Sequence, residues 1–191
     1  MDFDWSKELA EQLDWHWQHH LRPRLDGLTD EEYFWEPVPG CWSVRKRGTP
    51  TQTTTVGTGE YLFEFVYPEP EIAPVTTIAW RLAHVIVGVF AARSASHFGG
   101  PPASWREFDY AGSAAEALTQ LDDAYATWTK GASALGPDGL MRPCGPAEGP
   151  YAEYPLASLV LHINREALHH GAEIALLRDL YRAKGPGSHA L

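Results

Sequence analysis

The stretch "HINREALHHGAEIALLRDLYRA", residues 162–183, has the hydrophobic period of an amphipathic helix but carries many polar side chains. Apolar residues recur at steps of three, four and seven, which places them on one stripe of a helix that faces a core. We therefore predict a long helix that starts near Pro155 and ends at Gly185. The stripe begins upstream of the quoted stretch and consists of Leu156, Leu159, Ile163, Ala167, Ile174, Leu177 and Tyr181.

Two ionisable residues lie within this apolar stripe. Glu166 is at its edge and His170 at its centre, and because they are four residues apart their side chains meet on one face. Arg165 and Asp179 project the other way, and His169 lies off the stripe. A carboxylate or an imidazole in a core requires a partner. The pair either satisfies itself by hydrogen bonding or binds a ligand, and the helix alone leaves both alternatives open.

A third candidate, His84, lies in "TTIAWRLAHVIVGVFAARSASHF", residues 76–98. This stretch is apolar nearly all round, which is typical of a helix that is buried on more than one side, so His84 is expected inside. A lone buried histidine is more often a satisfied core residue than a metal ligand. Together with an E-x-x-x-H pair on another core helix, however, it favours a divalent metal, because this donor set suits zinc and also nickel or iron.

These motifs resemble a known family. "AWRLAHV" at 79–85, followed by E-x-x-x-H and then by "LLRDLY" at 176–181, is similar to the DinB-like superfamily, which includes mycothiol-dependent maleylpyruvate isomerases and bacterial thiol S-transferases. The resemblance covers most of the chain. It implies an all-α fold, a four-helix bundle that binds a divalent metal. Carried onto this sequence, it implies that His84, Glu166 and His170 are the ligands and that a low-molecular-weight thiol is the co-substrate.

The register of the second and third ligands can be checked against neighbouring residues. Aligning "LLR" at residues 176–178 with the family pattern places His170, and not His169, at the ligand position. The family glycine usually stands two residues after this histidine, whereas here Gly171 follows it directly. A slip by one residue would replace the pair by Arg165 and His169, and arginine is not a metal ligand. The register with Glu166 and His170 is therefore preferred.

The remaining helices complete one expected domain, residues 1–191. Residues 4–22 form the first expected helix, ending before Pro23, and residues 76–98 form the second. "TDEE" at 29–32 has the form of a capping box that starts a short helix, and "SAAE" at 113–116 starts the third long helix, which Gly131 is expected to close.

The connection between the first two long helices, residues 38–75, is unusually long for a compact domain. β-Branched and aromatic residues on both sides of "GTGE" at 57–60 predict a short β-hairpin. We expect this hairpin to be a flap near the mouth of the metal site. Arg45 and Arg47, just before it, could receive an anionic substrate, although a solvated turn is the simpler interpretation.

Several other polar residues have more than one interpretation. His162 stands four before Glu166, but it lies about 12 Å from His170 along the helix axis, so both cannot bind one ion directly. We predict that His162 orients a ligand or faces the substrate. Glu173 is the candidate base if the protein is a hydrolase. His16 and His20, four apart on the first helix, could form a second metal pair, but solvated histidines are the simpler interpretation.

Composition limits the partners and the compartment. A formal net charge of -10 argues against nucleic-acid binding. The first residues are acidic and unlike a signal peptide, and no apolar run is expected to approach about 20 residues, so we expect no membrane contact and a cytoplasmic location. Cys41 and Cys144 lack the spacing of a disulfide framework or a thiolate site. The sequence leaves a homodimer open.

The expected function follows from a metal with only three protein ligands, which is the arrangement of catalytic zinc sites. We expect a metal-dependent thiol S-transferase or thiol-dependent isomerase, in which a small thiol attacks a small electrophile as its thiolate. No catalytic side chain of the protein is assigned. A non-catalytic metal-binding or stress-response module and a metal-dependent hydrolase are the alternatives.

Overall fold

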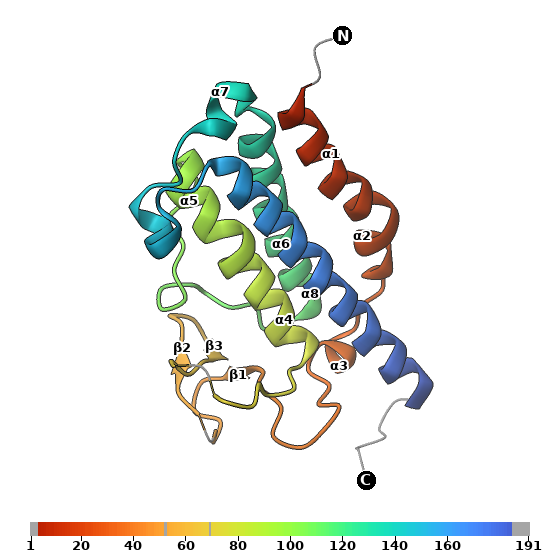
Figure 1. Ribbon diagram of the computed structural model, residues 1–191. Coiled ribbons are helices and arrows are strands. Elements are labelled where there is room, and N and C mark those ends of the chain that lie inside the picture. The colour runs from red at the N-terminus through yellow and green to blue at the C-terminus, as the bar shows by residue number, and fades with distance from the viewer. Residues whose placement is uncertain (1–3, 52, 69, 185–191) are drawn as a thin grey trace.

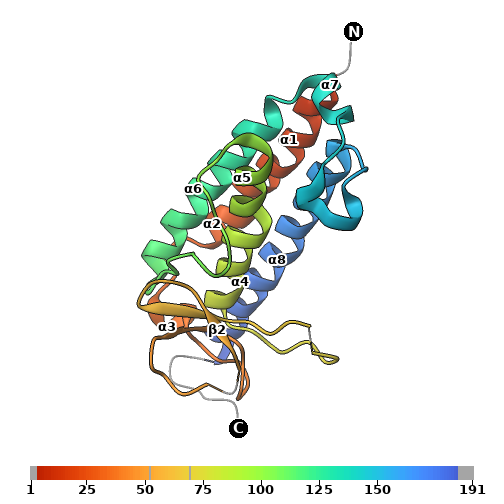
Figure 2. The same ribbon diagram turned by 90° about the vertical axis from the view of Figure 1, so that its left-hand side faces the viewer.

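A computed structural model describes residues 4–51, 53–68 and 70–184. The protein is mostly helical, and its long helical segments run side by side along the length of the molecule, with a small sheet at one end (Figures 1 and 2). The helices are α1 (Trp5–His16), η1 (Trp17–Leu21), α2 (Arg22–Arg24), α3 (Asp30–Tyr33), α4 (Ile78–His84), η2 (Val85–Ala91), α5 (Ala92–Phe98), α6 (Ala114–Ser133), α7 (Gly136–Met141), η3 (Pro146–Tyr151) and α8 (Leu156–Lys184).

The first long segment joins α1, η1 and α2 without a break. Asp4 caps its start by accepting hydrogen bonds from the backbone N–H groups of Ser6 and Lys7. The helix was predicted to end before Pro23, but it continues to Arg24. The reason is the π-helical stretch η1, which adds a residue to the turn before the proline and lets the chain remain helical past it.

The second long segment, α4, η2 and α5, is the most apolar one. By length and composition alone, Ile78–Phe98 could cross a membrane, with 21 residues and a mean hydropathy of 1.3 in its 18-residue window. The expectation of no apolar run near this length is therefore wrong. Within the described residues, however, 56% of that window is buried inside the protein, and a core helix of a soluble protein has the same character.

The third long helix, α6, starts where the sequence predicted and ends later. Ser113 accepts from the N–H of Glu116 as an N-cap, while the Glu116 carboxylate accepts from the N–H of Gly112. Gly131 was expected to close the helix, but it lies inside it. A Cβ atom at Gly131 would lie 2.1 Å from the ring of Phe98, so the glycine permits the close packing of α5 against α6.

The last helix, α8, buries two stripes rather than one. The predicted stripe is confirmed, with Leu156, Leu159, Ile163, Ala167 and Ile174 all buried. A second buried stripe consists of Val160, Asn164, Gly171 and Arg178, and it faces the first long segment. Asn164 donates to the carbonyl of Leu9 over 2.8 Å, and a Cβ atom at Gly171 would lie 2.9 Å from Leu21.

The predicted hairpin is confirmed, and it belongs to a three-stranded sheet. β2 (Thr55–Val56) pairs antiparallel with β3 (Tyr61–Glu64) around the "GTGE" turn, with Val56 opposite Phe63. The sequence did not predict β1 (Val44–Lys46), which pairs with the other edge of β3. The sheet order is β1-β3-β2, and the sheet lies near the start of α4 at the lower end of Figure 1.

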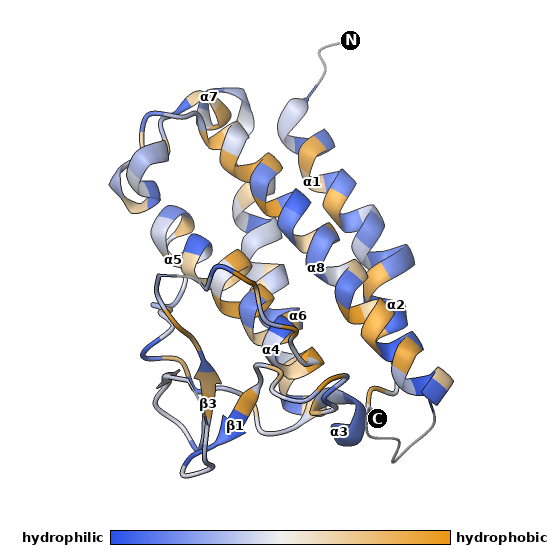
Figure 3. Ribbon diagram, turned by 60° about the horizontal axis from the view of Figure 1, so that its bottom comes forward, coloured by the Kyte–Doolittle hydropathy of each residue, from blue (hydrophilic) through white to orange (hydrophobic). Residues whose placement is uncertain are grey.

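Hydropathy along the ribbon follows these contacts. Apolar residues recur on the inward sides of the long helices, while hydrophilic residues cover their outer sides (Figure 3). The core consists largely of aliphatic and aromatic residues from all four long segments, together with Phe63 and Val56 of the sheet. The short helix α3 begins with the predicted capping box, since Thr29 and Glu32 exchange both hydrogen bonds.

Candidate metal centre

The three sequence-predicted ligands lie together between α4 and α8. His84 is the last residue of α4, directly before the π-helical stretch η2, and Glu166 and His170 are one turn apart on α8. One potential ligand atom from each residue lies within 4.8 Å of the other two. The rings of His84 and His170 meet edge to face with centroids 4.5 Å apart, and His170 Nε2 lies 3.4 Å from Glu166 Oε2.

A contact at Nδ1, the nitrogen that faces away from Glu166, fixes the orientation of the His170 ring. Nδ1 lies 2.7 Å from Glu173 Oε2, and the same oxygen lies 3.0 Å from Arg81 Nε. Because a carboxylate only accepts hydrogen bonds, Nδ1 carries the proton in the neutral ring. Nε2 then presents its lone pair toward Glu166 and His84. A carboxylate behind a histidine is the usual way in which proteins orient a metal ligand.

His84 is held between two tryptophans. Its ring stacks on Trp80 at 5.4 Å and on Trp105 at 5.7 Å, measured between centroids. Burial, His170 and Arg81 lower the pKa of His84 to about 3. The imidazole is therefore neutral near pH 7 and has a nitrogen lone pair available, which is the form that binds a metal.

The sheet completes the wall behind His84. Phe63 of β3 stacks on both Trp80 and Trp105 with centroid distances of 4.9 Å. Trp80 also donates from Nε1 to the carbonyl of Glu64 over 2.8 Å. The hairpin therefore lies next to the candidate centre, as a fixed support for its aromatic wall. Whether it also opens and closes as a flap stays a prediction.

Two imidazoles and one carboxylate fit a divalent metal such as zinc, and these three residues come from two different helices. The described residues contain a second such group, which consists of His169, His170 and Glu173. That group lies within one turn of α8, its His169 is exposed, and its Glu173 already contacts Arg81. We therefore assign the candidate centre to His84, Glu166 and His170.

His162 and Glu173 both contact the candidate ligands. His162 Nδ1 lies 3.5 Å from Glu166 Oε1, and Arg165 donates to the same Nδ1 over 2.7 Å. His162 is therefore beside the carboxylate ligand, where the sequence placed it. The Glu173 carboxylate, the candidate base of a hydrolase, is engaged by His170 and Arg81, which supports an orienting role instead.

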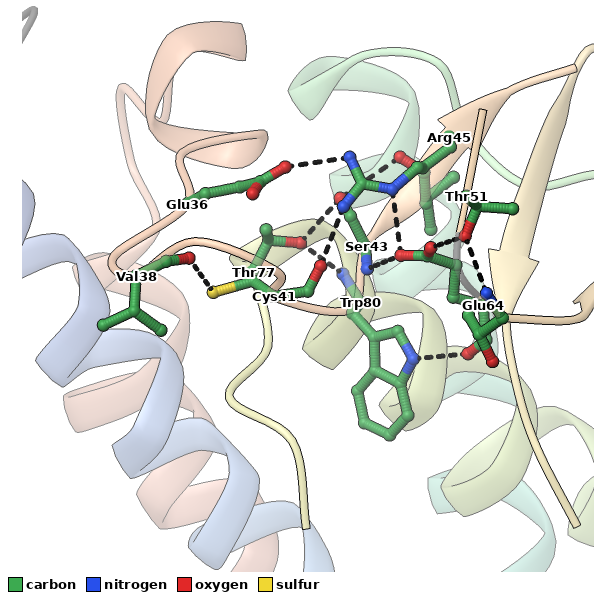
Figure 4. Close-up of polar contacts among 11 residues, drawn as sticks. Glu36, Val38, Cys41, Ser43, Arg45, Thr51, Glu64, Thr77 and Trp80 are labelled. Atoms are coloured by element: carbon green, nitrogen blue, oxygen red, sulfur yellow. Dashed lines mark hydrogen bonds and ion pairs between the residues drawn. The ribbon is translucent and has the colours of Figure 1, made fainter. Parts of the chain in front are cut away.

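Arg45 and Arg47 make contacts within the connection itself. Arg45 donates to Glu36, to Glu64 and to the carbonyl of Cys41 over 2.8 to 3.0 Å, and Ser43 N–H also donates to Glu64 (Figure 4). Arg47 donates to the backbone carbonyls of residues 58 and 59. Both guanidinium groups thus hold the sheet together, and neither is placed beside the three ligands by any of these contacts.

The sequence did not single out Arg81, Trp80 or Trp105. Arg81 and Trp80 occur within the motif around His84, and the helical spacing of three and four residues could have placed them on its face. Trp105 carries no such signal, because it follows the second long segment in an irregular stretch. The alternative pair His16 and His20 has stacked rings with centroids 5.6 Å apart, but neither belongs to a group of three potential ligands among the described residues.

The fold and the site together define a mostly helical protein with a His/Glu centre suited to a divalent metal. A family model, the DinB superfamily, matches residues 52–174. The chain belongs to the DinB superfamily, and the matched residues include all three candidate ligands. No curated protein matches the chain, and no solved structure matches it.

Proposed function

We propose that this protein is a divalent-metal-dependent thiol S-transferase or thiol-dependent isomerase, built on a four-helix bundle of the DinB type. His84, Glu166 and His170 hold the metal, with zinc as the preferred ion. The observation that carries the proposal is the convergence of these three ligand atoms within 4.8 Å, with His170 oriented by Glu173. A bound divalent ion supplies a Lewis acid that favours the thiolate form of a small thiol over its neutral form.

The protein's own residues keep one side of this centre accessible. The side chain of Glu166 is 27% exposed, whereas that of His170 is 9% exposed, so the centre is nearest to solvent on the Glu166 side. Trp80 and Trp105 close the opposite side behind His84. Three protein ligands with an accessible side support a catalytic site over a closed structural one.

The environment of the centre also suits a ligand set that consists of histidine nitrogens and a single carboxylate. His84 is neutral near pH 7, so the Glu166 carboxylate is the sole anionic ligand. Glu173 accepts from His170 and balances Arg81, which keeps the imidazole in one tautomer. No serine or cysteine nucleophile of the protein is required, because the co-substrate thiol is the nucleophile.

The test is to measure thiol consumption in the presence of an electrophile, with metal-loaded and metal-free protein. Mycothiol and bacillithiol are screened against an epoxide, a halogenated aromatic and an activated alkene, and adducts are detected by mass spectrometry. We expect adducts only with metal-loaded protein, since free thiols of pKa about 8.5 are only a few per cent thiolate at pH 7.

Two variants control this experiment. Glu166→Gln is expected to weaken both metal retention and rate because it removes the sole anionic ligand. His169→Ala is the matched control, because His169 is exposed and outside the proposed ligand set. If metal-loaded protein accelerates none of these reactions while metal strongly raises its Tm, the metal has a structural role and the catalytic proposal is wrong.

A further inference from the structure

A cleft lies between α5, η3 and the beginning of α8, outside the three candidate ligands. Its volume is about 560 Å³, which is within the range of small-molecule sites. The η3 segment, cyan in Figure 1, lies beside α5 and the start of α8. We propose that this cleft binds a small aromatic carboxylate group, which, if the proposed function holds, is the anionic end of the electrophilic substrate of the metal centre.

Two arginines give the cleft its charge. Arg93 and Arg165 both line it together with one carboxylate, that of Glu148, and the Glu166 carboxylate lies at its edge, 3.6 Å from Arg165 Nε. Glu148 is already balanced, because its Oε1 lies 2.9 Å from His97 Nε2 and 3.3 Å from Arg93 Nε. This lining is unusual in a chain with a net charge of -10, and it favours an anionic ligand.

Both guanidinium groups have donor capacity left for a ligand. Arg93 Nε is buried 3.3 Å from Glu148 and makes no hydrogen bond among the described residues, but 31% of the Arg93 side chain is exposed, which leaves the outer part of its guanidinium group for a ligand. A guanidinium group carries five N–H donors and matches a carboxylate in a bidentate geometry. Arg165 lies at the edge of the cleft with 69% of its side chain exposed, so a ligand can reach it.

The tautomer of His162 adds a neutral donor. Arg165 Nη2 lies 2.7 Å from His162 Nδ1, and arginine only donates, so Nδ1 accepts and the neutral ring carries its proton on Nε2. His162 also lines the cleft. The cleft therefore presents guanidinium and imidazole N–H groups, which together suit the oxygens of a carboxylate.

The opposite wall is aromatic. Tyr151 and Tyr154 line the cleft and meet edge to face with centroids 5.7 Å apart, yet 63% and 54% of their surfaces are exposed. Exposed tyrosines beside a cleft offer an apolar ring face at small entropic cost and suit a flat, aromatic ligand group. Leu159 extends this apolar surface on α8.

Two lining residues of the cleft contact the carboxylate ligand of the candidate metal centre. Glu166 Oε1 lies 3.5 Å from His162 Nδ1 and 3.6 Å from Arg165 Nε. A carboxylate held by His162 and Arg165 is therefore one side chain away from a proposed metal ligand. A substrate whose carboxylate occupies this position would have the rest of its structure close to the candidate metal centre.

The protein contains its own reporter for this cleft. Cys144 lines it and is half-buried, whereas Cys41, the other cysteine of the sequence, is 2% exposed. Iodoacetamide, a neutral reagent, should therefore modify Cys144 first. Burial and Glu148 raise the pKa of the Cys144 thiol, so the reaction is followed at constant alkaline pH by mass spectrometry.

We expect benzoate to slow alkylation of Cys144 in a saturable manner. Benzamide, which has the same ring but no charge, and cyclohexanecarboxylate, which has the charge but no aromatic ring, should each protect at least about tenfold more weakly. Absence of protection by benzoate, or equal protection by benzamide, would overturn the proposal. Cys144→Ser protein verifies that the signal comes from this residue.

Variants then assign the binding to the two walls. Arg165→Gln and Tyr154→Ala should each weaken benzoate protection about tenfold or more, and Arg106→Gln, an exposed arginine outside the cleft, should leave it unchanged. Unchanged protection in both cleft variants, verified as folded by circular dichroism, would contradict the proposal. Because the assay uses the full chain without metal or thiol, a protein that binds benzoate but consumes no thiol separates this proposal from the proposed function.

Discussion

Two groups of ionisable residues lie on the same helix, α8, and they differ in how their polar atoms are satisfied. Near the end of the helix, Arg178 is 1% exposed and donates to both oxygens of Glu32, over 3.1 and 2.9 Å. It also donates to the carbonyls of Arg24 and Asp26. Two to three turns earlier, His170 and Glu166 converge with His84, and the guanidinium group beside Glu166, that of Arg165, is 69% exposed and lies 3.6 Å away.

The comparison separates a structural ion pair from a candidate binding site. Arg178 directs four of its five N–H donors to acceptors of the protein and is 1% exposed, so it is closed to a ligand. At the metal centre, Glu173 satisfies the outer nitrogen of His170, and Glu166 Oε1 has longer contacts, 3.5 Å to His162 and 3.6 Å to Arg165, while one potential ligand atom of each residue faces the other two. Burial alone therefore does not mark a functional site. A functional site is better indicated by potential ligand atoms that face one another while a second group, such as a carboxylate, holds the ligand's other polar atom in place.

The largest expected effect is on the structural pair. Arg178→Met should lower the free energy of unfolding by about 3–5 kcal/mol, because Glu32 is left as a buried charge without its partner. Urea denaturation measures this change. Arg182→Met is the control, since Arg182 contacts the same carboxylate at 3.5 Å but is 55% exposed, and it should cost less than about 1 kcal/mol. Equal effects of the two substitutions would contradict the comparison.

The same pair predicts a dependence of stability on pH. Burial raises the pKa of Glu32, but hydrogen bonds from Arg178 and from the Thr29 N–H outweigh this effect and leave the pKa below its ordinary value of 4.5. The carboxylate therefore contributes stability that is fully present above about pH 4.5 and is lost as the pH falls below it. In Glu32→Gln this part of the acid destabilisation should disappear, as followed by denaturation at several pH values.

Substitutions of the candidate ligands should reduce metal affinity strongly and change the stability of the metal-free protein little. His170→Ala should reduce divalent metal affinity by about 100-fold or more, because it removes one of three donors. In metal-free protein, His84→Leu should change the free energy of unfolding by less than about 1.5 kcal/mol, because it replaces a half-buried imidazole by an apolar side chain of similar size. Elemental analysis and denaturation in chelator measure the two effects. A loss of stability in His84→Leu as large as in Arg178→Met would show that His84 is a core residue.

A smaller effect on metal affinity is expected from Glu173, which contacts the ligand His170 but is not itself a ligand. Glu173→Ala should weaken metal binding by about 10–100-fold, because His170 Nδ1 loses the carboxylate that orients it. Glu173→Gln should be milder, since its amide oxygen can still accept the same hydrogen bond. Competition with a metal chelator measures both affinities. Unchanged affinity in Glu173→Ala would mean that this contact does not position His170.

The smallest expected effect concerns the helix that carries Glu32. Thr29→Ala should cost about 1 kcal/mol of stability, because it removes the side-chain cap of α3. Thr119→Ala is a suitable control on the exposed face of α6. Metal affinity should be unchanged in both proteins, because the cap supports the structural pair and not the metal centre. A parallel loss of metal would show that the two regions are coupled.

Local patterns in the sequence determined several features of this protein. The helical period placed Glu166 and His170 on the buried face of α8, and Thr29 and Glu32 predicted their capping box. The "GTGE" turn predicted the hairpin that β2 and β3 form. Each of these features depends on residues within a few positions of one another, so hydrogen bonding and periodicity within the segment suffice to predict it.

Tertiary structure decided the features that join distant residues. The burial of Arg178 depends on Glu32, the second stripe of α8 depends on the first helical segment, and the wall behind His84 depends on Phe63 and Trp105. A polar residue is stable in the core only where its partners arrive, and the sequence does not state which segments pack together. The sequence therefore determined the main apolar face of α8, and packing decided which further face was buried and whether an ionisable residue became part of an ion pair or of a candidate metal centre.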